Sequence, residues 1–155
     1  MTGDSTPRAS EKGNGLLAIA VGGGIAGTLD LLQACILFGW KIPLVIAGGL
    51  LGRAAFQGGV GTYVLGVLLH FFIACSAAAV YYGAGRRLRF LIEYPLVCGL
   101  FFGAAVEDVM SFIVLPLSAL HSKGPYRLHD LILGLAVHMV VIGLPISYSV
   151  RRFGK

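Results

Sequence analysis

Charged residues are scarce in this sequence. Only 12% of the residues are Asp, Glu, Lys or Arg, whereas an ordinary soluble domain contains about a quarter. Hydrophobic residues make up 57% of the chain, and the mean hydropathy is +0.85. A chain of 155 residues with so few polar groups cannot wrap a buried core in polar surface. The composition therefore excludes an ordinary soluble domain and predicts one membrane domain.

The sequence also lacks the common signatures of catalysis, metal binding and nucleic-acid binding. It has no HExxH pattern, no nucleophile motif and no phosphate-binding loop, which predicts that the chain is not an enzyme. Its three cysteines, Cys35, Cys75 and Cys98, form no CxxC spacing, and we expect reduced thiols within apolar segments. The net charge of +5 comes from short basic clusters rather than from a continuous stripe, so we expect no nucleic-acid partner.

One motif has to be rejected. Gly22, Gly24 and Gly27 match the GxGxxG fingerprint of dinucleotide-binding proteins. That fingerprint also needs a second strand and an acidic residue about 20 positions later, but Lys41 and Ile42 occupy that region. The pair Gly23 and Gly27 forms a GxxxG pattern instead, which is typical of closely packed membrane helices.

Four apolar runs, each long enough to cross a membrane, organise the chain. About 20 helical residues cross a hydrocarbon layer of ~30 Å, and the runs cover residues 15–40, 59–82, 95–120 and 131–150. We therefore predict an all-α, four-helix transmembrane bundle that forms a single domain over residues 15–152. The polar residues 1–14 predict a disordered cytoplasmic tail, and residues 153–155 predict a short C-terminal tail.

A shorter apolar stretch separates the first two spans. Residues 42–56 are interrupted by Pro43 and three glycines and carry Arg53, so they are too short and too broken to cross the bilayer. We expect an interfacial or re-entrant half-helix there, because irregular backbone is tolerated at this depth only where protein or water covers it.

The distribution of Lys and Arg predicts the orientation. With the N-terminus inside, eight basic residues fall on the inner side and four on the outer side. The inner set is Arg8, Lys12, Arg86, Arg87, Arg89, Arg151, Arg152 and Lys155, and the outer set is Lys41, Arg53, Lys123 and Arg127. This excess predicts that both termini are cytoplasmic.

Each span carries one ionisable residue in a row of small residues with helical spacing. The four ionisable residues are Asp30, His70, Glu107 and His138; the rows are Gly23, Gly27 and Asp30; Thr62, Gly66, His70, Ala74 and Ala77; Gly99, Gly103, Glu107 and Ser111; and Gly134, His138 and Pro145. Small residues mark helix contacts, so we expect the ionisable groups to point into the bundle. The same faces predict self-association, with the number of copies open.

Counting residues from the inner ends places the four groups at similar depth. At 1.5 Å per residue, Asp30 lies about 22 Å from the inner end and the other three about 18 Å. An isolated charged carboxylate at the bilayer centre costs at least ~2.5–3.5 kcal/mol, so the acids need a partner, water, a proton or a cation. We therefore predict one polar site near the midplane, formed by all four residues.

Three roles are compatible with such a site. The groups could carry protons or cations, which is the leading hypothesis, or they could only hold helices together in a structural or assembly protein. A haem or metal cofactor is the third possibility, and His70 and His138 are its candidate ligands. The sequence leaves the cofactor content open.

Other residues carry weaker signals. Asp108 is rotated by about 100° from Glu107, and we expect it to face Arg53 or a water-filled crevice. His121, His129 and Asp130 should lie at the outer ends of the last two spans, with Asp130 in a first helical turn. Pro116 and Pro145 predict kinks or helix ends, which can serve as hinges or as packing devices.

The chain resembles a group of small, uncharacterised bacterial membrane proteins with four predicted spans. The resemblance rests on GTLDLLQA at Gly27–Ala34, GLLGRAAFQGG at Gly49–Gly59, LLHF at Leu68–Phe71 and VLPLSAL at Val114–Leu120. It covers nearly all of the chain after residue 14, and the adjacent acids Glu107 and Asp108 depart from the group's pattern. The resemblance implies a multi-pass protein of the bacterial inner membrane and carries no activity.

Overall fold

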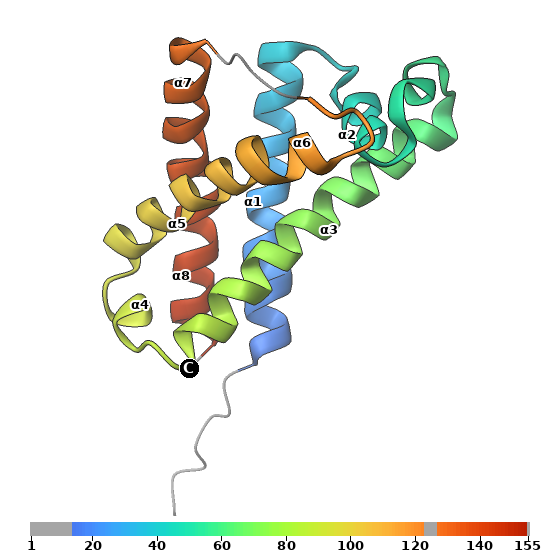
Figure 1. Ribbon diagram of the computed structural model, residues 1–155. Coiled ribbons are helices and arrows are strands. Elements are labelled where there is room, and N and C mark those ends of the chain that lie inside the picture. Colours follow the sequence, from blue (N-terminus) through green and yellow to red (C-terminus); the bar gives the residue numbers. More distant parts are fainter. Residues whose placement is uncertain (1–13, 123–126, 155) are drawn as a thin grey trace, which may run out of the picture.

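The computed structural model describes residues 14–122 and 127–154, and all regular secondary structure within these ranges is helical. Four helices are long and apolar enough to cross a membrane: α1 at Gly15–Phe38, α3 at Val60–Gly85, and two composite helices at Pro95–Leu117 and Leu128–Phe153. The predicted all-α, four-helix fold is confirmed (Figure 1). Of the predicted tails at residues 1–14 and 153–155, residues 1–13 and 155 lie outside the described residues, Asn14 caps α1, and Phe153 is the last residue of α8.

The predicted half-helix is also present. It consists of α2 at Ile42–Leu51 and a 3-10 turn, η1, at Gly52–Gln57. Gly39, with φ of 96°, ends α1, and a proline in the first turn of α2 starts the new helix. On one side α2 packs against α3, where the backbone carbonyl of Pro43 lies directly against Gly66.

The other side of α2 contacts the chain that follows the third span. The backbone N–H of Ala119 donates a hydrogen bond to the carbonyl oxygen of Gly49 at 2.8 Å. The Leu120 side chain lies 3.2 Å from the position that a Cβ on Gly48 would occupy. The half-helix therefore joins two segments that are distant in sequence.

Both composite helices contain a π-helical segment. The third span consists of α5 at Pro95–Val109, η2 at Met110–Val114 and α6 at Leu115–Leu117. The fourth consists of α7 at Leu128–His138, η3 at Met139–Gly143 and α8 at Leu144–Phe153. A proline ring clashes with the carbonyl four residues earlier, and those carbonyls belong to π-helical residues in both spans. The wider turns thus accommodate Pro145 inside the fourth span and Pro116 one residue before the third span ends at Leu117.

The core lies where α1 packs against α3 and α8. Its buried members are Ala18, Ala26, Ala78, Tyr81, Ile142, Ile146 and Val150. Tyr81 is 1% exposed, and its hydroxyl donates a hydrogen bond to the Leu91 carbonyl oxygen at 2.8 Å. Outside this core, large apolar side chains such as Leu16 and Val60 are 81% exposed. This outward apolar surface suits a lipid environment.

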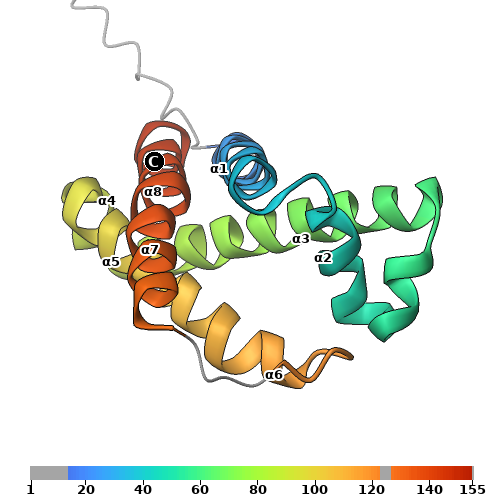
Figure 2. The same ribbon diagram turned by 90° about the horizontal axis from the view of Figure 1, so that it is seen from above.

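The helices form an open arrangement rather than a closed ring. Helix α1 packs between α3 and α8, and α5 packs on α7, η3 and α8. Helices α3 and α5 approach each other through the rings of Tyr81 and Phe102, whose centroids are 4.9 Å apart. Farther along they diverge (Figure 2), leaving an apolar groove of about 290 Å³ between Ile73–Val80 of α3 and residues 102–114 of the third span.

One end of the bundle gathers the start of α1 and the ends of α3 and α8. A Cβ on Gly15 would overlap the Tyr82 ring, and a Cβ on Gly154 would lie 3.1 Å from the same ring. The short helix α4, at Phe90–Glu93, packs against α8 nearby. Five arginines lie in the segments at this end, at positions 86, 87, 89, 151 and 152.

The cysteines are free thiols: Cys35 is buried, and Cys75 and Cys98 are half-buried.

Candidate functional site: two carboxylate–imidazole pairs

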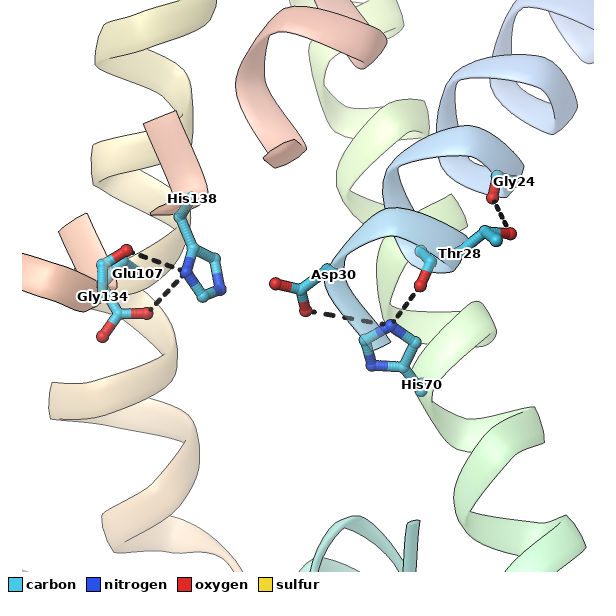
Figure 3. A network of polar contacts seen from close by, with 8 residues as sticks. Gly24, Thr28, Asp30, His70, Glu107, Gly134 and His138 are labelled. Atoms are coloured by element: carbon cyan, nitrogen blue, oxygen red, sulfur yellow. Dashed lines mark hydrogen bonds and ion pairs between the residues drawn. The ribbon is translucent and has the colours of Figure 1, made fainter. Parts of the chain in front are cut away.

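The first pair lies between α1 and α3. The His70 ring Nε2 is 2.9 Å from the carbonyl oxygen of Gly27 and 3.8 Å from the Asp30 carboxylate (Figure 3). The first distance is a hydrogen bond, whereas the second is an ion-pair distance too long for one. Both side chains are nearly buried, with 13% and 14% exposed. Asp30 is therefore held close to His70 without being bonded to it.

The second pair lies between α5 and α7 and is tighter. His138 Nδ1 is 3.1 Å from the Glu107 carboxylate and 3.0 Å from the carbonyl oxygen of Gly134. The Ser111 hydroxyl donates a hydrogen bond to the other Glu107 oxygen at 2.9 Å. The exposed fractions are 20% for His138 and 13% for Glu107. This pair is a connected network of side chains and one helix carbonyl.

Glycines allow the backbones of the second pair to approach. A Cβ on Gly103 would overlap the His138 carbonyl oxygen, and a Cβ on Gly134 would lie 2.7 Å from Glu107 Oε1. The row of small residues predicted around Glu107 is therefore the face that packs on the fourth span. Close backbone approach is what brings the carboxylate to the imidazole.

Both π-helical segments adjoin this second pair. Segment η2 begins three residues after Glu107, and η3 begins directly after His138. Single π-helical turns inside α-helices are frequent at functional sites, because they disturb the regular backbone bonding there. Helices α1 and α3 are regular α-helices around Asp30 and His70.

The structure thus groups the four predicted residues into two pairs rather than one cluster. Each pair joins two different helices (Figure 3). In residues 14–122 and 127–154, no group of three His, Cys, Asp or Glu side chains is placed to hold a metal ion. Asp30 lies four residues beyond Ala26, and His138 four residues before Ile142, and both Ala26 and Ile142 belong to the core cluster. Both pairs therefore lie about one helical turn from the packed core.

The hydrogen bonds determine which ring nitrogen carries the proton in each neutral histidine. A backbone carbonyl can only accept, so Nε2 of His70 and Nδ1 of His138 are the N–H groups. The opposite nitrogen of each ring then has the lone pair and can accept a proton. Each pair therefore presents one ring nitrogen with a free lone pair, while the other ring nitrogen keeps its contacts with the carbonyl and the carboxylate.

The remaining polar residues lie outside these pairs. The predicted contact between Asp108 and Arg53 is absent: both are exposed, and no salt bridge joins them in the described part of the chain. Rotation by about 100° turns Asp108 outward from the contact that Glu107 makes. His129 and Asp130 form an exposed pair at the start of α7, 84% and 62% exposed, with 3.4 Å between Nδ1 and Oδ1. His121 is exposed, with φ of 49°.

Two parts of the site were not predicted from the sequence. The backbone carbonyls of Gly27 and Gly134 fix the histidine tautomers. Every residue has such a carbonyl, so the sequence does not single these two out. The π-helical segments do have a signal in the sequence, because Pro116 and Pro145 each follow the start of a segment by six residues.

No protein family, no curated protein and no solved structure matches this chain. The resemblance to small bacterial membrane proteins therefore stays a prediction.

Proposed function

We propose that this chain is an integral membrane protein that handles protons through Asp30, His70, Glu107 and His138. One observation carries the proposal: in each pair, a single imidazole nitrogen faces both a helix carbonyl and a carboxylate. An imidazole held this way accepts a proton at its opposite nitrogen and remains charge-compensated inside an apolar bundle. Ionisable residues inside spans commonly mark substrate or ion pathways, and proton relays are among them.

Other cargo has less support. A small cation needs several oxygen ligands, whereas the two carboxylate oxygens of Glu107 already contact Ser111 and His138. A haem with two histidine ligands needs both imidazoles to face one planar pocket. His70 and His138 instead lie in different helix contacts, the first between α1 and α3 and the second between α5 and α7. An absorbance spectrum and a metal analysis of the purified protein test both possibilities directly.

Proton flux in liposomes tests the proposal. The purified protein is reconstituted with a pH-sensitive dye inside, and a proton gradient is imposed in the presence of a potassium ionophore. We expect the wild-type chain to dissipate the gradient faster than protein-free liposomes. Glu107→Gln and His138→Ala should reduce the rate to the protein-free level, because each removes one member of the connected pair.

The chain offers a matched control. His129 and Asp130 have the same chemistry as the buried pairs but are exposed at the start of α7. The double variant His129→Ala, Asp130→Asn should leave the flux unchanged. Wild-type flux in Glu107→Gln, with folding intact, would refute the proposal.

A structural role is the second candidate, and one observation favours it. Every buried side-chain nitrogen or oxygen in the described residues has a hydrogen-bond partner, which is also what a purely structural network requires. Under this alternative, Glu107→Gln and His70→Ala lower the thermal stability and change no flux. Polar contacts between membrane helices contribute on the order of 0.6 kcal/mol each.

We further propose that both termini are cytoplasmic and that the chain resides in a bacterial inner membrane, where it self-associates and has no enzymatic activity. The five arginines in the segments at the shared end of α1, α3 and α8 support this orientation. Cysteine variants at position 87 and at position 53, labelled with a membrane-impermeant maleimide in intact cells, test it. Only the position 53 variant should react.

A further inference from the structure

Asp108 is an exposed acid in the middle of a membrane-spanning helix. It lies in the third span, Pro95–Leu117. At 1.5 Å per residue, it is about 20 Å along the helix from Pro95 and about 14 Å from Leu117. In a helix that crosses a bilayer the headgroups lie near its two ends, and neither end of this helix is within reach of a short Asp side chain.

The surface around Asp108 is apolar. Phe101, about two helical turns before Asp108, is 72% exposed, and Phe112, one turn beyond Asp108, is 57% exposed. Val109 is 46% exposed. The position therefore faces the lipid in a bundle whose outward side chains are hydrocarbon.

No charged group of the described chain compensates Asp108. Its neighbour Glu107 is turned toward Ser111 and His138. The helices packed against α5 contribute the ionisable groups Glu93 of α4; His129, Asp130 and His138 of α7; and Tyr148, Arg151 and Arg152 of α8. No salt bridge joins any of these groups to Asp108 among residues 14–122 and 127–154.

We propose that Asp108 is a proton-binding carboxyl group on the lipid face, protonated in the membrane and open to modification by apolar carbodiimides. A charged carboxylate in hydrocarbon is strongly unfavourable, and the group neutralises itself by binding a proton when no cation is available. This inference depends on the membrane location and on the exposure of Asp108. It is independent of whether the buried pairs conduct protons.

The modification follows from the protonated state. The carboxyl group transfers its proton to one carbodiimide nitrogen, and its oxygen forms a bond to the central carbon, giving an O-acylisourea. The acyl group then migrates from oxygen to nitrogen to give a stable N-acylurea. Nothing leaves, so the protein gains the whole mass of the reagent. An ionised carboxylate lacks the proton that the first step requires.

The experiment treats the full chain in liposomes with dicyclohexylcarbodiimide, which partitions into lipid, and locates the added mass by peptide fragmentation. We expect the wild-type chain to be labelled on Asp108. The variant Asp108→Glu should still be labelled at residue 108, and Asp108→Asn should not be labelled there. The matched control is Asp130→Asn, which removes an exposed acid at the helix end and should leave labelling of Asp108 unchanged. A water-soluble, membrane-impermeant carbodiimide should not label Asp108.

Two results would overturn the proposal. Labelling of Asp108 by the impermeant reagent would show that water, rather than lipid, surrounds the carboxyl group. Absence of label on folded wild-type protein, together with an oligomer that dissociates in Asp108→Asn, would show that a second copy of the chain covers the carboxyl group. Circular dichroism of each variant confirms that it is folded before labelling is compared.

Discussion

The two carboxylate–imidazole pairs contain similar groups but differ in geometry. Glu107 lies 3.1 Å from His138, receives a hydrogen bond from Ser111 and is flanked by π-helical segments on both spans. Asp30 lies 3.8 Å from His70 between two regular α-helices. The backbone around a pair, more than its chemical composition, sets how strongly its two members are coupled. We therefore expect the second pair to dominate both stability and proton exchange.

The two pairs should differ most in the unfolding free energy that is lost when a glycine beside each pair is replaced by alanine. In Gly103→Ala the new Cβ would overlap the His138 carbonyl, a backbone atom that cannot move aside cheaply. We expect a loss of about 3 kcal/mol in unfolding free energy, at the upper end of the usual cost of overpacking. In Gly27→Ala the Cβ would meet the Phe71 ring at 3.0 Å. The new Cβ would also lie 3.1 Å from the Ala74 Cβ. The Phe71 ring can turn, the Ala74 contact needs a shift of a few tenths of an ångström, and alanine favours helix by about 1 kcal/mol, so the net change should stay below about 1 kcal/mol.

Reversible unfolding of the detergent-solubilised protein by titration with dodecyl sulfate measures both values. Equal losses for the two alanine variants would show that the two helix contacts are equally tight.

Double-mutant cycles compare the pairs directly. For Glu107→Ala with His138→Ala we expect a coupling free energy of about 1.7 kcal/mol, near the largest values known for polar contacts in membrane helices. For Asp30→Ala with His70→Ala we expect less than about 0.6 kcal/mol, because the two side chains are not hydrogen-bonded. The same unfolding assay gives both cycles. A larger coupling in the Asp30 cycle would reverse our ranking of the pairs.

Removing a proline should disturb one pair only. In Pro145→Ala the restored N–H can bond to the carbonyl of Val141, which favours a regular α-helix over η3. Relaxing a π-helical turn rotates the preceding helix by up to about 100°, and this moves His138 relative to Glu107. We expect proton flux to fall by on the order of tenfold, with slower hydrogen exchange at Met139–Gly143.

The control for this variant is Pro43→Ala, which alters a first-turn proline of α2 where no π-helical segment is present. It should retain wild-type flux. If Pro145→Ala also retains it, the π-helical turn has no part in positioning the pair.

The smallest effect should come from the hydroxyl that supports Glu107. Ser111→Ala removes the 2.9 Å hydrogen bond to Glu107, and we expect a loss of about 0.6 kcal/mol in unfolding free energy. Ser76→Ala is the comparison, because the Ser76 hydroxyl bonds only to the Phe72 carbonyl of its own helix. The change in unfolding free energy for Ser76→Ala should be close to zero. Indistinguishable unfolding curves for the two variants would mean that Ser111 adds nothing to the second pair.

The helices and their inward faces were predictable because lipid imposes simple requirements. A span needs about 20 apolar residues, and the four long helices begin and end within a few residues of the predicted limits. The row from Gly99 to Ser111 predicted which face of the third span packs against another helix, since only small residues permit close approach. The half-helix was predictable from its length and its interruptions.

The pairing of the site residues was not predictable from one sequence. A row of small residues indicates that a face is buried but does not identify the helix that covers it. Because α3 and α5 diverge, His70 and Glu107 belong to different contacts, and one expected cluster becomes two pairs. The outward position of Asp108 follows from helical rotation alone. Its lack of a basic partner required the positions of the neighbouring helices.

The contacts of α2 have a consequence for the order in which the protein is assembled. One face of the half-helix meets Gly66, which is synthesised shortly after it, but the other meets Ala119 and Leu120. Leu120 follows Gly48 by 72 positions, 120 minus 48, and synthesis at about 5–20 residues per second makes this a delay of several seconds. The first two spans are therefore made while the half-helix is packed on one side only. The second packing surface of α2 forms only after the third span and the residues Ala119 and Leu120 that follow it have been synthesised.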